Sequence, residues 1–83
     1  MLIGLNIDVA QTATTTAYRQ AVAAARARVL PRVRQLTSEW VATLEYDAHN
    51  NAAIVRVLTQ EPVPRSCREA LRRLPGVAWL LDD

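Results

Sequence analysis

The sequence lacks several residue types, and each absence narrows what the protein can be. Its 83 residues include no lysine, no phenylalanine, one cysteine and two glycines. The lone Cys67 excludes a disulfide framework within the chain, and two isolated glycines exclude a glycine-rich phosphate loop. With only two Trp and two Tyr, the core has to be built from Ala, Val, Leu and Ile. A thin core of this kind predicts modest stability.

Composition and charge describe an ordinary folded domain. The chain is 51% hydrophobic and 22% charged, which is typical of a globular protein and argues against disorder. Its length allows one domain, residues 1–83. The net charge is +2, and the positive charges come from arginine because the sequence has no lysine. A charge this small does not indicate a nucleic-acid partner.

No stretch of the sequence predicts a membrane span or a signal peptide. The opening residues MLIGLNIDVA are apolar, but Asn6 and Asp8 interrupt them too early for either. No membrane partner is therefore expected. We expect a cytoplasmic location if Met1 is the native start, and leave it open if the chain was trimmed from a longer one.

The first half of the chain predicts a strand followed by a long helix. Residues 2–9 alternate between apolar and mixed positions, as a half-buried strand does. After the polar stretch 11–16, which offers several N-caps, apolar residues recur every three or four positions. Pro31 lies within this run and predicts a kink or a break into two helices. The stripe consists of Tyr18, Val22, Ala25, Val29, Val33 and Leu36.

Residues 40–59 predict a β-hairpin. Residues 40–48 alternate, and a two-residue turn at Asn50-Asn51 would join them to the strand that follows. The register that this turn sets gives two apolar pairs on one face and one pair of opposite charges on the other. The pairs are Tyr46 with Val55, Leu44 with Val57, and Glu45 with Arg56.

The last part of the chain predicts a short helix and a final strand. Ser66 and Glu69 have the spacing of a capping box, while Pro64 is an alternative first helical residue. Cys67, Ala70, Leu71 and Leu74 mark its buried side. Pro75-Gly76 ends the helix, and residues 77–81 form an apolar strand.

The predicted order of elements is β-α-β-β-α-β. Two helices on one face of a four-stranded antiparallel sheet give an α+β, ferredoxin-like fold. In such a fold the helices bury one face of the sheet, and nothing in the chain covers the other.

The sequence offers little chemistry for an enzyme. His49 is the only histidine, with Asp47 two residues away, and no second His or Cys lies near it in sequence to complete a catalytic or zinc site. Ser66 has no neighbouring base and is better explained as a cap. Trp40 and Tyr46, which could stack on RNA bases, belong to the face assigned to the core. We therefore expect no catalytic residue, no cofactor and no metal site.

The uncovered face carries the remaining functional signal. Several of its positions are apolar where a solvated strand would be polar, which favours a protein partner. The positions assigned to it are Val41, Thr43, Glu45 and Asp47 on one strand, with Ile54, Arg56 and Leu58 on the next.

The second half of the chain resembles the propeptide domain of subtilisin-like serine proteases, a family that includes free-standing propeptide-like inhibitors. The resemblance covers roughly residues 40–83. It rests on Tyr46-Asp47 before the hairpin turn, Ala53-Ile54-Val55 after it, the phrase LRRLPGVA at 71–78, and Asp82-Asp83. Asn51 stands where this family usually has glycine.

The resemblance implies a binding mode. Propeptides of this family lay their open sheet face on two surface helices of the protease, acting as inhibitor and folding chaperone. Acidic groups at the sheet edge cap the N-termini of those helices. It thus implies capping by Glu45, Asp47, Asp82 and Asp83, with Val41, Ile54 and Leu58 in apolar contact.

Two other interpretations stay open. The same face could form a homodimer or bind a small ligand, as in regulatory ferredoxin-like modules. Alternatively, the arginines of the first helix could bind nucleic acid, which would make the affinity depend steeply on salt.

Overall fold

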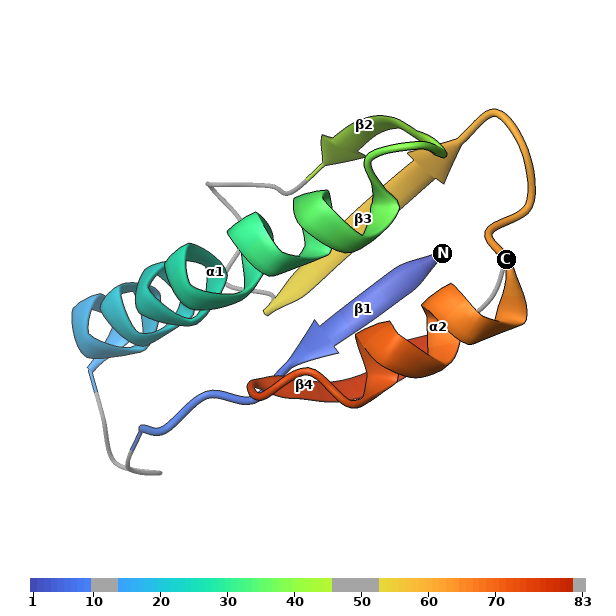
Figure 1. Cartoon of the computed structure of the whole chain (residues 1–83). Coiled ribbons are helices and arrows are strands. Elements are labelled where there is room, and N and C mark those ends of the chain that lie inside the picture. Colours follow the sequence, from blue (N-terminus) through green and yellow to red (C-terminus); the bar gives the residue numbers. More distant parts are fainter. Residues whose placement is uncertain (10–13, 46–52, 82–83) are drawn as a thin grey trace.

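The computed structural model of the chain describes residues 1–9, 14–45 and 53–81. The order of elements is β-α-β-β-α-β, and the four strands form one antiparallel sheet in the order β2-β3-β1-β4. Both helices lie on the same face of this sheet (Figure 1). The predicted α+β, ferredoxin-like fold is confirmed. Its elements are β1 (Leu2–Leu5), α1 (Thr15–Thr37), β2 (Val41–Glu45), β3 (Ile54–Thr59), α2 (Arg65–Arg72) and β4 (Val77–Leu81).

The two central strands supply the middle of the core. Ile3 on β1 and Val55 on β3 are direct cross-strand partners, and both are fully buried. β1 is shorter than predicted, because Ile7 and Val9 lie beyond its end at Leu5. The helix stripe packs onto this layer, so α1 and α2 are held by burial of apolar surface rather than by helix propensity alone.

Helix α1 begins at a polar cap and runs unbroken through its proline. The Thr14 side chain accepts a hydrogen bond from the Ala17 N–H at 3.1 Å. Of the two outcomes expected at Pro31, a kink or a break, the break is wrong: the ring is exposed, and the helix continues to Thr37. Leu30 and Val33 are buried on either side of the proline. Their packing therefore outweighs the cost of one missing backbone hydrogen bond.

Helix α2 starts at Arg65, between the two starting points that the sequence signals indicated. Pro64 is the N-cap rather than the first helical residue, and no side chain caps the helix. The capping box is therefore wrong, because Ser66 lies inside the first turn. Glu69 instead pairs with Arg65 one turn before it, at 3.3 Å on an exposed surface. Such a pair contributes at most a few tenths of a kcal/mol, roughly.

The hairpin register is confirmed where it is described. Leu44 pairs with Val57, and Glu45 pairs with Arg56. The third predicted pair, Tyr46 with Val55, is not tested, because Tyr46 lies outside the described residues. The Asn50-Asn51 turn and His49 also lie outside them.

The turn between α2 and β4 depends on Gly76. This residue has a φ of 92°, and the Val77 N–H donates to the Leu74 carbonyl at 3.1 Å across the turn. A Cβ at Gly76 would also lie 2.9 Å from Cγ2 of Val29 on α1. Strain of the backbone and crowding of the helix therefore act in the same direction.

We expect Gly76→Ala to destabilise the domain by about 2 kcal/mol, lowering its melting temperature by roughly 10 °C. Thermal unfolding followed by circular dichroism measures this. Ala78→Gly, a change of similar size two residues away on an exposed position, is the control. If Gly76→Ala has the same melting temperature as the wild type, the turn adjusts to the new side chain without strain.

Candidate protein-binding face

The side of the sheet opposite the helices is a surface built from all four strands (Figure 1). Successive residues of a strand point to opposite sides of the sheet, and this determines which residues lie on that surface. Ile3, Val55 and Val57 point into the core, so their neighbours along the strands point outward. We call this surface the open face. Its described residues are Leu2, Gly4, Thr43, Glu45, Ile54, Arg56, Leu58, Trp79 and Leu81.

The register arranges these residues in rows that cross the sheet. One row has a charged half and an apolar half: Glu45, Arg56, Leu2 and Leu81 are successive cross-strand partners. The neighbouring row is Ile54, Gly4 and Trp79. The open face is therefore polar towards β2 and apolar towards β4.

The apolar half contains the most exposed large hydrophobic side chains of the described part of the chain. Trp79 is 43% exposed and Leu81 is 57% exposed. Leu2 and Ile54 beside them are half-buried. Single exposed apolar residues need no explanation, but an adjacent group of four on a flat sheet is typical of an interaction surface.

Gly4 lies underneath Trp79. A Cβ at this position would overlap Cε2 and Nε1 of the indole ring, so the ring occupies the space above the β1 backbone. Gly4 is buried for this reason, although it belongs to the open face. An aromatic side chain covering a glycine on the neighbouring strand is a known way to compensate for the missing side chain.

Most of the predicted face residues in the described ranges lie where the sequence placed them. Glu45 and Arg56 are exposed, and Ile54 and Leu58 are half-buried on the open face. The placement of Val41 is wrong, because its side chain packs against the core. An irregularity between Val41 and Thr43 shifts the register there and turns Val41 inward. Asp47, Asp82 and Asp83 lie outside the described residues.

The sequence interpretation missed the β4 side of the face. Residues 77–81 form an uninterrupted apolar run, which gives no alternation to read. In the structure, Leu5 pairs with Val77 but Gly4 pairs with Trp79, so Ala78 is an extra residue in β4. This bulge places Val77 in the core and Trp79 on the opposite face. The available signal was Gly4, a glycine inside a strand pattern.

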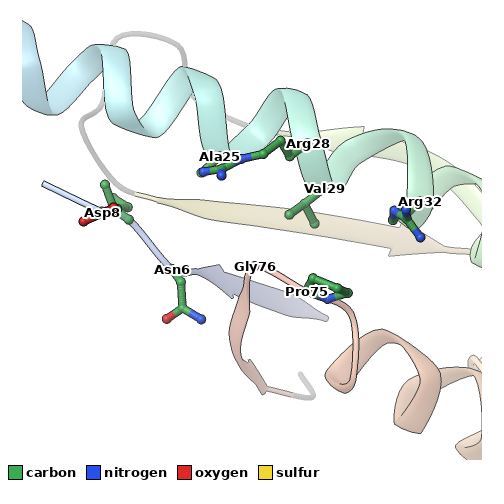
Figure 2. A pocket seen from close by; sticks show the side chains of 9 residues that line it. Asn6, Asp8, Ala25, Arg28, Val29, Arg32, Pro75 and Gly76 are labelled. Carbon is green, nitrogen blue, oxygen red and sulfur yellow. The ribbon is translucent and has the colours of Figure 1, made fainter.

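A separate hollow of about 550 Å³ lies between α1, the segment after β1 and the turn before β4. Figure 2 shows Ala25, Arg28, Val29 and Arg32 on its helix side. The Asn6 side chain projects away from α1, so it does not converge with the arginines (Figure 2). The Asn6 N–H already donates to the Gly76 carbonyl at 2.8 Å. A ligand site needs convergent polar groups, and this hollow does not present them.

Cys67 is a core residue rather than a reactive thiol. Its side chain is 8% exposed, and Sγ lies 3.1 Å from the Leu36 carbonyl oxygen, to which the thiol donates. Burial raises the pKa of the Cys67 thiol, which keeps it protonated at neutral pH.

This burial predicts a dependence of stability on alkaline pH. In the unfolded chain the thiol ionises at its ordinary pKa, whereas the folded protein holds the proton to higher pH. The contribution to stability is therefore complete below the ordinary pKa and is lost as pH rises through the raised one. Urea unfolding between pH 7 and pH 10 should show a steeper loss in the wild type than in Cys67→Ala. Equal slopes would mean that the thiol ionises alike in both states.

Within the described ranges, neither a metal-binding cluster nor a membrane-spanning helix is present. No three His, Cys, Asp or Glu side chains there are placed to hold a metal ion. Neither α1 nor α2 is long and apolar enough to cross a membrane. In comparisons with protein-family models, with curated proteins and with solved structures, nothing matches this chain.

Proposed function

We propose that this chain is a non-enzymatic, propeptide-like module. Its open face binds a subtilisin-type serine protease, and the module acts as an inhibitor, a folding chaperone or both. The observation that carries the proposal is the open face itself, a flat sheet surface with an apolar half and a charged half. Exposed apolar side chains grouped on one surface, with polar groups beside them, are typical of protein interfaces.

The protease as partner comes from the resemblance of residues 40–83 to subtilisin propeptides. That binding mode requires a sheet with one face free of helices, and this fold has one (Figure 1). Glu45 is exposed on the outer strand β2, and we propose that its carboxylate caps a helix N-terminus of the protease. Asp47, Asp82 and Asp83 are proposed for the same role from the sequence alone.

Titration of the purified domain into a panel of subtilisin-type proteases tests this function. Hydrolysis of a peptide substrate reports inhibition, and calorimetry on variants lacking the catalytic serine reports binding without digestion. A chymotrypsin-type protease, which shares the chemistry but has another fold, is the control. Absence of binding to the whole panel would contradict the proposal.

A homodimer through the same face is the second candidate. Exposure of Trp79 and Leu81 favours it, because a second copy would cover both. Light scattering separates the two. A stable dimer that fails to bind any protease of the panel would support self-association, whereas a monomer that binds a protease supports the first proposal.

A further inference from the structure

The indole of Trp79 lies over the middle of the open face, in the space that the missing side chain of Gly4 leaves. Trp79 belongs to β4, an edge strand, but its ring extends over Gly4 on β1, one of the two central strands. Half-buried Leu2 and Ile54 on the open face are sequence or register neighbours of that glycine. The largest apolar side chain of the face thus lies near its centre, with smaller apolar groups around it.

We infer that Trp79 is the anchor of the interface and that Gly4 is the residue that positions it. This inference rests on the proposed function and names the part of the open face that supplies its affinity. A few residues usually carry most of the energy of an interface, and tryptophan is the type most enriched among them. Such anchors lie centrally and are surrounded by residues that mainly exclude water.

The fixed position of the ring lowers the cost of binding. A side chain that is already held in its bound place loses little conformational freedom when the partner arrives. Gly4 provides that place, because any side chain there would collide with the ring. Gly4 has no positive φ, so its backbone accepts alanine without strain. The lack of a side chain, rather than backbone freedom, is what this position requires.

Trp79 covering Gly4 could also serve only to stabilise the sheet. The two roles differ in what they change. A purely structural role predicts lower melting temperatures and unchanged affinity. An anchor role predicts lower affinity in variants that remain folded. Gly4→Ala is informative because the atom it adds meets the end of a side chain, which can move, and not backbone.

The experiment measures four proteins against an inactive subtilisin-type protease selected by the panel: wild type, Gly4→Ala, Trp79→Ala and the double variant. We expect Trp79→Ala to weaken binding about 30-fold and Gly4→Ala roughly 10-fold. Because Gly4 acts through Trp79, the double variant should bind no more weakly than Trp79→Ala. Leu81→Ala, which removes a more exposed side chain from the same face, should change affinity by less than about 5-fold.

Fluorescence of the free protein checks the position of the ring. In a Trp40→Phe background Trp79 is the only tryptophan, and acrylamide quenching should increase when Gly4→Ala displaces it. If the wild type binds and the four affinities agree within 3-fold, the anchor is disproved while the proposed function stands. If the double variant is weaker by the product of the single effects, Gly4 does not act through Trp79. If no protease binds the wild type, both the function and the anchor are rejected.

Discussion

Replacing Ile3 by alanine is expected to lower the free energy of unfolding by about 3 to 4 kcal/mol. Ile3 is fully buried at the centre of the sheet, opposite Val55, so the lost methyl groups leave a cavity that neighbours cannot fill. An 83-residue domain has roughly 4 to 12 kcal/mol of stability in total. The melting temperature should fall by about 20 °C, measured by circular dichroism.

Leu2 provides a matched control on the same strand. It precedes Ile3 in sequence and faces the open side, where it is half-buried. Leu2→Ala should cost less than about 1 kcal/mol, because little of the side chain leaves an apolar environment. Comparable losses of stability for the two variants would contradict the assignment of the two faces of β1. For affinity towards the proposed protease partner we expect the opposite order. Among folded proteins, Leu2→Ala should lower this affinity more than Ile3→Ala does.

The parts of the fold that follow a regular period could be predicted from sequence. The 3.6-residue stripe identified α1, and the two-residue alternation identified β1, β2 and β3. The hairpin register was predictable because apolar and charged pairs agreed on one alignment, as Leu44 with Val57 and Glu45 with Arg56. A shift by one residue would have reversed both faces.

The errors arise where a local irregularity breaks the period. One extra residue near Val41 turns that side chain inward, and the extra Ala78 turns Trp79 outward. Bulges depend on how two strands meet, so neither strand shows them alone. The helix does not break at Pro31 for a related reason, since burial of Leu30 and Val33 on the helix exceeds the local penalty. Long-range packing decided each of these positions.

Both bulges determine which residues lie on the open face. In a regular strand without the bulge, Val77 and Trp79 would point to the same side, and with Val77 in the core the open face would lose its largest apolar residue. The irregularity at Val41 removes an apolar group from the β2 side. Together the two bulges leave the open face polar at its β2 edge and apolar at its β4 edge. A partner therefore needs an apolar patch opposite β4 and polar groups opposite β2.

Ile54→Asp should abolish most of the binding through the open face. Ile54 adjoins Gly4 in the row that ends at Trp79, so a partner covering the indole also covers this position. A partner covering the indole would remove a carboxylate at this position from water, and that desolvation is costly. We expect affinity for the inactive protease to fall at least about 100-fold. If the protein is instead a homodimer, the same variant should be a monomer in light scattering.

The controls for Ile54→Asp separate charge, folding and position. Gln35→Asp adds the same charge on the exposed surface of α1, which the sheet separates from the open face, and should leave affinity unchanged. Ile54→Thr keeps a β-branched strand former while adding a polar group, and should lower affinity by an intermediate factor of roughly 10. Circular dichroism establishes that each variant is folded. A folded Ile54→Asp that binds as tightly as Gln35→Asp would mean that the partner contacts another surface, and that the apolar half of the open face has a different purpose.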